Sequence, residues 1–292
     1  MIKTYRSFAK INLFLSVLGR RDDGYHDLCT LMTQIDLYDD IHIDFNSKEI
    51  SVSCLHPDVP EDHSNLVIKA AKLFYQTLKS RARDFQGGLS MQIDKKIPPG
   101  GGLGGGSSNA ATVLMALNEH HNQPFAIEKL MEMGLQLGAD VPFFIFGKPA
   151  VAKGVGERLE SVPHLKPYHL VLCDPGVAAS TAAVYKNIDF RLTSNQKDNI
   201  KSGLNVLLRG QEFDVGDCLH NDLEESACRL YPKIRETKEE MELLLQKKVF
   251  MTGSGSSLFA LFSNPKDAKK GFECLSKKWA KSKRSVFLSS FI

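Results

Sequence analysis

The chain has 292 residues, of which 42% are hydrophobic and 24% are charged, and its formal net charge is +3. This composition is typical of a globular protein with one large domain or two domains. The small net charge gives no argument for a nucleic acid or a membrane surface as partner, and no stretch approaches the roughly 20 apolar residues of a membrane span.

The six cysteines are widely scattered, without the short paired spacing of a zinc site or a redox motif. The N-terminus enters a strand-like alternation directly, with no long apolar run after its positive charges. We therefore expect no disulfide framework and a cytoplasmic location, although a plastid origin with a removed transit peptide stays open.

The first predicted element is a strand within residues 8–19, because apolar and polar residues alternate there. Lys10 and Asn12 lie on one face of this strand and should project together. On an open antiparallel sheet one polar face can simply be wet, so a solvated and a functional interpretation both stay open.

A hairpin turn is predicted at Asp23-Gly24, a strong turn pair. Tyr25 and His26 follow the turn directly and supply an aromatic ring and a ring with two hydrogen-bonding nitrogens. Taken alone, such residues are ordinary surface residues.

Residues 95–111 read KKIPPGGGLGGGSSNAA, with six glycines among the seven positions from Gly100 to Gly106. Before them, residues 89–93 alternate as a strand, and after them residues 110–117 repeat at helical spacing. The glycines therefore connect a strand to a helix, whereas a flexible tether would not need a helix directly behind it.

Ser107, Ser108 and Asn109 are candidates for the N-cap of this helix. Glycines bring backbone N–H groups close to a ligand, and a helix start adds unpaired N–H groups and the positive end of the dipole. The segment therefore predicts a cradle for nucleotide phosphates.

Several phosphate-binding motifs are excluded. A second helix follows at residues 126–138, where a Rossmann unit requires a strand. The chain contains no Walker loop, no protein-kinase H-R-D or D-F-G motif, and no G-x-S-x-G nucleophile elbow.

Asp140 follows this second helix and precedes an apolar run, residues 141–146, that we expect to be a strand. A carboxylate there is either a turn former or a base at the mouth of a buried strand. Residues 151–160 are interpreted as a connection.

The remaining chain is predicted to alternate strands and helices. Strands are expected at 169–173, on both sides of the TGSGSS turn at 252–257, and at 285–291, with helices near 180–188, 200–208, 216–230, 233–247 and 265–279. The turn either closes a hairpin or lines the same anion site as the first glycine loop. Segregated strands and helices of this kind predict an α+β fold.

These motifs together resemble the GHMP kinases, whose phosphate loop is similar to PPGGGLGGGSSNAA. An N-terminal AKIN strand, the GADVPFF segment and a late TGSGSS turn occur in the same order as in that family. The resemblance implies a two-domain fold: an N-terminal α/β nucleotide-binding half over residues 1–155 and a C-terminal ferredoxin-like half with extra helices over residues 156–292.

The resemblance also implies that Lys10 and Asp140 are the catalytic pair, with Asp140 accepting the proton of the substrate hydroxyl and Lys10 orienting it. Asn65 would lie toward adenine. The residues implied to wrap the ATP phosphates are Pro99, Gly100, Gly101, Gly102, Leu103, Gly104, Gly105, Gly106, Ser107, Ser108 and Asn109.

The implied substrate is a small cytidyl compound. Tyr25 would stack on the cytosine, His26 would bond the base edge, Tyr185 would cover the other face with Thr181 nearby, and Asn12 would contact the methylerythritol end. Mg²⁺ is expected with ATP, and its ligands stay open between Ser107, Ser108, water and a carboxylate. No nucleic acid, membrane or obligatory protein partner is expected.

Two alternatives remain. The first is a kinase of the same family acting on homoserine or a mevalonate derivative, for which a base-stacking pair has no use. The second is a non-catalytic nucleotide- or RNA-binding protein that uses its basic tail, where residues 266–284 hold eight Lys or Arg against two acids. This second alternative leaves Lys10 and Asp140 unexplained.

Overall fold

The computed structural model describes residues 2–22, 24–79, 88–188 and 215–292. The chain forms two compact units that interleave along the sequence. The first unit comprises Met1–Ala9, Leu37–Pro99 and Gly104–Gly147, and the second comprises Lys10–Asp36, Gly100–Leu103 and Lys148–Ile292. The predicted domain boundary near residue 155 lies within the second unit. The division into domains of residues 1–155 and 156–292 stays a prediction.

Two long strands, β1 (Ile2–Arg20) and β2 (His26–Asp44), contribute to both units. In the first unit, the parts of β1 before Lys10 and of β2 from Leu37 onward form a sheet with β4 (Leu89–Asp94) and β3 (Ile50–Cys54). The strand order of this sheet is β3-β4-β2-β1. β4 runs antiparallel to β2 and parallel to β3.

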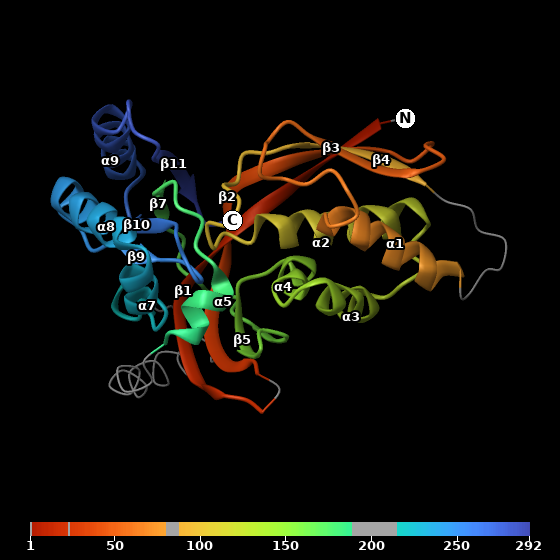
Figure 1. Ribbon diagram of the computed structural model, residues 1–292, viewed down its shortest axis with the longest axis horizontal. Coiled ribbons are helices and arrows are strands. Elements are labelled where there is room, and N and C mark those ends of the chain that lie inside the picture. Colours follow the sequence, from red (N-terminus) through yellow and green to blue (C-terminus); the bar gives the residue numbers. More distant parts are fainter. Residues whose placement is uncertain (1, 23, 80–87, 189–214) are drawn as a thin grey trace. The chain divides into compact units, whose positions relative to one another are not determined.

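The helices of the first unit are α1 (Leu66–Lys79), α2 (Gly105–His120), α3 (Ile127–Leu137) and α4 (Val141–Phe146). α1 and α2 lie between the sheet and the α3–α4 pair (Figure 1). α2 is buried over much of its surface because alanines and aliphatic residues occupy most of its second and third turns.

The second unit contains the rest of β1 and β2, within Lys10–Asp36, together with three further strands. These are β5 (Ala150–Gly154), β6 (Arg158–Ser161) and β8 (His220–Asn221). A separate antiparallel sheet has the order β11-β7-β10-β9. Its strands are β7 (His169–Asp174), β9 (Phe250–Met251), β10 (Leu258–Phe262) and β11 (Ser285–Ser290).

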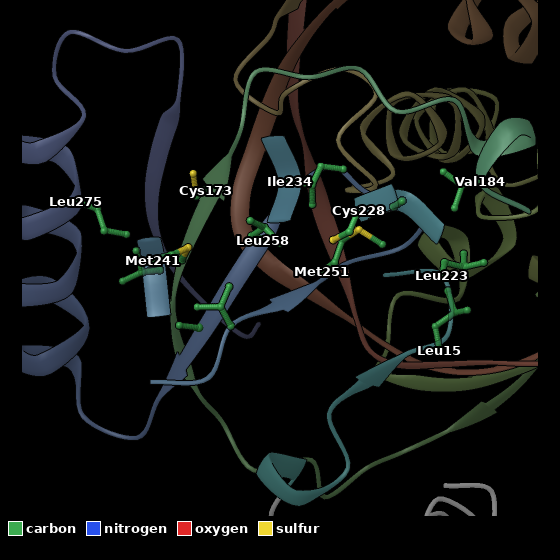
Figure 2. Packing of buried hydrophobic residues seen from close by; sticks show 14 of the residues in the cluster. Leu15, Cys173, Val184, Leu223, Cys228, Ile234, Met241, Met251, Leu258 and Leu275 are labelled. Atoms are coloured by element: carbon green, nitrogen blue, oxygen red, sulfur yellow. The ribbon is translucent and has the colours of Figure 1, made fainter. Parts of the chain in front are cut away.

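The helices of this unit are α5 (Thr181–Lys186), the 3-10 helix Val215–Asp217, α7 (Glu224–Leu230), α8 (Pro232–Leu245) and α9 (Pro265–Lys278). One apolar cluster joins α5, α7, α8 and α9 to the sheets (Figure 2). Its members include Leu15 of β1, Val184 of α5, Met241 of α8, Leu258 of β10 and Leu275 of α9.

Most predicted elements are confirmed: β1, β4, β7, the strands β9 and β10 around the TGSGSS turn, β11, and helices α2, α3, α5, α8 and α9. The predicted helix near 200–208 lies outside the described residues. All six cysteines are free thiols. Across the described ranges, no helix is long and apolar enough to cross a membrane.

Three predictions are wrong. Residues 141–146 form the helix α4 instead of a strand; Pro142 lies in its first turn, and Gly147 (φ 67°) ends it. The helix predicted near 216–230 begins only at Glu224, because residues 220–221 pair with β1. Residues 151–160 form the β5–β6 hairpin instead of a plain connection. Helix α1 had no counterpart among the predicted elements.

His121 caps the C-terminal end of α2 and gives the first unit a pH-dependent stability. Its ring lies 5.8 Å, between centroids, from both Phe74 and Tyr75 of α1. Burial, together with the neighbouring His120, lowers the pKa of His121 below its usual 6.5.

The unfolded chain therefore binds a proton at His121 that the folded chain does not hold. The free energy of unfolding should fall as the pH drops from 6.5 toward the lower folded pKa. In urea titrations between pH 7.5 and 5.5, His121→Phe should show a shallower fall in the free energy of unfolding than the wild type. Parallel curves for wild type and His121→Phe would contradict this expectation.

Candidate functional site

A buried carboxylate holds both ends of the glycine loop within the first unit. Asp39 is fully buried, and its Oδ1 accepts hydrogen bonds of 2.8 Å from the backbone N–H groups of Lys96 and Ile97. Its Oδ2 accepts from Lys95 Nζ at 2.6 Å and from Asn109 Nδ2 at 3.0 Å. The segment before the loop and the helix after it are therefore tied to one side chain.

The start of α2 differs in detail from the prediction. The N-cap is Gly104 rather than Ser107, Ser108 or Asn109, and its carbonyl accepts the first helical hydrogen bond, from Ser108 N at 2.8 Å. The N–H groups of the first helical turn, at residues 105–107, precede that bond and have no acceptor within the helix. These backbone groups are the ones suited to an anion.

The side chains of Ser108 and Asn109 face the interior of the first unit. Ser7 Oγ donates to Ser108 Oγ at 2.8 Å and accepts from Asn109 Nδ2 at 2.9 Å. Ser108 and Asn109 are only 2% and 3% exposed. Their contacts with ATP stay a prediction, and their backbone rather than their side chains is the part suited to it.

The middle of the loop, Gly100–Leu103, belongs to the second unit. Gly101 O accepts from Ser257 N at 3.1 Å, and Leu103 O accepts from Lys10 N at 3.0 Å. Gly102 has φ 76°, and a Cβ there would collide with the carbonyl of Thr252. Positive φ values occur at alternate loop positions, 100, 102 and 104, and an alternation of this kind is the backbone pattern from which anion-binding nests are built.

Lys10 and Asn12 project together, as predicted. Lys10 Nζ donates to Asn12 Oδ1 at 2.6 Å, and the two residues are 3% and 4% exposed. The interpretation of this face as a wet surface is therefore wrong. Asn12 Nδ2 donates to Thr30 Oγ1 at 2.8 Å, and Asn12 N donates to Thr252 Oγ1 at 2.9 Å.

The TGSGSS turn closes the β9–β10 hairpin and also supports the loop segment. β9 and β10 pair antiparallel, with Met251 opposite Leu258. Asn221 Nδ2 donates to the carbonyls of Met251 and Gly253, each at 2.8 Å. Ser254 Oγ lies 2.8 Å from Thr181 Oγ1 of α5. The turn is therefore held by two neighbouring elements of the second unit, β8 through Asn221 and α5 through Thr181.

Two of the aromatic candidates, His26 and Tyr185, contact each other, and the roles predicted for Tyr25, His26 and Tyr185 around a base stay a prediction. His26 stacks on Tyr185 of α5, with ring centroids 5.2 Å apart and planes inclined by 29°. Tyr25 lies beside His26 in sequence and is 63% exposed. Burial and Arg20 lower the pKa of His26, so the ring is neutral at pH 7 and offers one donor and one acceptor.

The remaining candidates lie in the first unit. Asp140 is half-buried and occupies the N-cap position of α4, where its side chain makes no capping hydrogen bond. Asn65 is 7% exposed; its Oδ1 accepts from Val67 N at 3.1 Å and its Nδ2 donates to Pro60 O at 2.6 Å. Asn65 therefore caps α1, and its place toward adenine stays a prediction.

Three supporting residues were missed: Asp39, Thr30 and Thr252. A signal for Asp39 was available, because it shares the face of Leu37, Ile41 and Ile43 in an alternating strand, and an acid on an apolar face needs buried partners. The two threonines carry no comparable sequence signal.

Comparison with known proteins supports one family over both halves of the chain. The family described as GHMP kinases N terminal domain matches residues 65–148, and that described as GHMP kinases C terminal matches residues 207–281. A protein of Syntrophotalea carbinolica named 4-diphosphocytidyl-2-C-methyl-D-erythritol kinase is 42% identical over 94% of this chain and 95% of its own length. A protein of the same name from Clostridium novyi is 37% identical over 94% and 96%.

Solved structures agree with this comparison. The crystal structure of a 4-(cytidine 5'-diphospho)-2C-methyl-D-erythritol kinase aligns with a TM-score of 0.78 and 34% identity, covering 99% of both chains. A homoserine kinase from Cytophaga hutchinsonii aligns with a TM-score of 0.71 but only 16% identity, which supports the fold alone.

Asp39 offers a test of the buried network. Asp39→Asn leaves the ammonium of Lys95, whose side chain is 5% exposed, without its counter-charge, and such a loss typically costs about 3–5 kcal/mol of stability. The neighbouring pair Asp40–Lys96 is more exposed, at 23% and 51%, so Asp40→Asn should cost less than about 1 kcal/mol. Urea unfolding of both variants checks the difference, and equal losses would contradict it.

Two glycines of the loop offer a second matched pair. Gly102→Ala forces a side chain into positive φ and against a backbone carbonyl, which should cost about 1–3 kcal/mol or more. At Gly106, inside α2, a Cβ would meet only Leu66 Cδ1 at 3.6 Å. Gly106→Ala should therefore raise the free energy of unfolding by about 0.5–1 kcal/mol. Thermal and urea unfolding measure the stability of both variants. A loss of stability in Gly106→Ala as well as in Gly102→Ala would contradict the expected difference between the two positions.

Proposed function

The chain belongs to the GHMP kinase family, and we propose that it transfers the γ-phosphoryl group of ATP to a hydroxyl of 4-diphosphocytidyl-2-C-methyl-D-erythritol, giving the 2-phosphate. The observation that carries the proposal is the 42% identity to a kinase of that name over 94% of this chain. The solved kinase that aligns with a TM-score of 0.78 and 34% identity over 99% of both chains also supports the proposal. The product would enter isoprenoid precursor synthesis.

Phosphoryl transfer asks a protein mainly for positioning and electrostatic stabilisation. In the proposed mechanism Asp140 accepts the proton of the attacking hydroxyl, because an alcohol is too weak an acid to ionise by itself at neutral pH. Lys10 orients the hydroxyl and offsets developing negative charge. Its ammonium, held by Asn12 Oδ1 at 2.6 Å, is already oriented by the protein.

The proposed ATP site uses backbone rather than side-chain groups. The N–H groups of residues 100–107 receive the phosphates, because the loop alternates in φ and ends at the positive end of α2. Mg²⁺ is proposed to arrive on the phosphates, where it neutralises charge on the transferring group. Mg²⁺ bound with a nucleotide usually keeps several waters and takes phosphate oxygens as ligands.

The cytidyl end is assigned to the aromatic residues of the second unit. Tyr25, which is 63% exposed, is proposed to stack on the cytosine, and Tyr185 to cover its other face with Thr181 nearby. His26, whose ring contacts Tyr185 and is neutral, is proposed to donate and accept at the base edge. Asn12 is proposed to contact the methylerythritol end. Homoserine and mevalonate have no ring for which such a stack is useful.

Substrate choice and the base can be tested in one experiment. ADP release is measured with Mg-ATP and 4-diphosphocytidyl-2-C-methyl-D-erythritol, mevalonate or homoserine as acceptor. Wild type should turn over the cytidyl substrate alone. Asp140→Ala should lower kcat by about 10²–10⁴-fold, the usual contribution of a general base.

The matched control is Glu273→Ala, which removes an exposed carboxylate from α9 and should leave kcat unchanged. Turnover of mevalonate or homoserine in place of the cytidyl substrate would move the assignment to another branch of the family. Nucleotide binding that survives in Asp140→Ala, with no turnover of any acceptor by wild type, would indicate a non-catalytic binding protein.

A further inference from the structure

The catalytic lysine is positioned by an amide group that is itself fixed. Lys10 Nζ donates to Asn12 Oδ1 at 2.6 Å, and both side chains are buried. A lysine has a flexible four-carbon stem and an ammonium group with three rotatable donors, so the side chain by itself does not fix where the ammonium points. The oxygen of the Asn12 carboxamide, a buried acceptor for this ammonium, therefore helps to set the direction of the Lys10 head group.

A carboxamide has two nearly equivalent ends, and only one orientation works here. If the group turned over, its NH₂ would meet the Lys10 ammonium, donor against donor. Thr30 sets the orientation: its hydroxyl donates to Phe14 O at 2.6 Å, which leaves its lone pairs to accept from Asn12 Nδ2 at 2.8 Å. The nitrogen end of the amide is therefore held on the side of Thr30.

Thr252 holds the other end of the same residue. Its Oγ1 accepts from Asn12 N at 2.9 Å and donates to Asn12 Oδ1 at 3.3 Å. Thr252 is fully buried and opens the turn whose Ser257 N donates to Gly101 O. One short segment of the second unit thus supports both the lysine's acceptor and the middle of the glycine loop.

We propose that the hydroxyls of Thr30 and Thr252 are positioning groups for Lys10, acting through the carboxamide of Asn12. The inference rests on the proposed function, in which Lys10 acts on the transferring group. Neither threonine needs to touch substrate for this role. Loss of either hydroxyl removes part of the support of the carboxamide and shifts the direction of the ammonium, which slows the chemical step and leaves ATP binding largely intact.

The test compares variants that remove the hydroxyl with variants that keep it. Thr30→Val and Thr252→Val preserve shape but not the hydrogen bonds, whereas Thr30→Ser and Thr252→Ser preserve the hydroxyl. The valine variants should lose roughly 10–100-fold in kcat with KM for ATP within about threefold of wild type, since small misplacements of catalytic groups have effects of this size. The serine variants should stay within about threefold of wild type in kcat.

Thr237→Val is the matched control. Thr237 of α8 is also fully buried in the second unit, and its hydroxyl has no hydrogen-bond partner within the ranges that the structure describes. This variant should therefore keep wild-type kcat. Circular dichroism and thermal unfolding of all variants establish that each is folded before its rates are compared.

A double-mutant cycle tests the route through Asn12. If Thr252 acts through Asn12, Thr252→Val should lower kcat little further once Asn12→Ala is present. Full additivity of the two effects would overturn the proposal. So would folded valine variants with wild-type kcat, or serine variants as impaired as the valine variants.

A readout without turnover separates this proposal from the proposed function. In protein labelled with ¹⁵N-lysine, the Nζ resonance of Lys10 is identified by its loss in Lys10→Arg. It should shift or broaden in both threonine-to-valine variants and return in the serine variants. If wild type turned over no cytidyl substrate, the proposed function would fail, while an unchanged Lys10 resonance in the valine variants would still overturn the positioning role.

Discussion

The first unit is organised around the hydrogen bonds of the Asp39 carboxylate. A buried anion is costly to desolvate and is tolerated only when its lone pairs are satisfied. Here the carboxylate accepts four hydrogen bonds. Three come from residues 95–97, which lie between β4 and the glycine loop, and one comes from Asn109 of α2. The same charge that would be destabilising alone therefore fixes the spacing between Lys95 and Asn109, and with it the direction in which the first turn of α2 points its N–H groups.

Glycine-rich backbone has many accessible conformations, and ordering each residue costs about 1–2 kcal/mol of conformational entropy. A loop of this kind is useful for electrostatic stabilisation only if its dipoles are fixed before the ligand arrives. Unit one fixes the ends of the loop through Asp39, and unit two fixes Gly100–Leu103 through the TGSGSS turn and the backbone of Lys10.

Local sequence patterns predicted the features that depend on neighbours in the chain. Period-two alternation placed Lys10 and Asn12 together, and the strand–glycine–helix order identified the loop. The apolar run at 141–146 was assigned to the wrong element, because six consecutive apolar residues have no period that separates a strand from a short helix. The partners of Asn12 could not be predicted, because Thr30 and Thr252 lie 18 and 240 residues away and nothing near them in sequence marks the contact. Family resemblance supplied the roles of Lys10 and Asp140, and those roles still await measurement.

The bond between Asn12 and Thr252, 240 residues apart, also has a consequence for the order of synthesis. At the usual rate of about 5–20 residues per second, Lys10 leaves the ribosome roughly 10–50 s before the segment that fixes its neighbour. The β8 partner of Phe14 and Leu15 is also made late. During this interval Leu15 and Val17, which end in the core of the second unit, lack most of their packing partners. The nascent chain must therefore carry an apolar strand segment through most of its own translation, a period in which chaperone binding competes with aggregation.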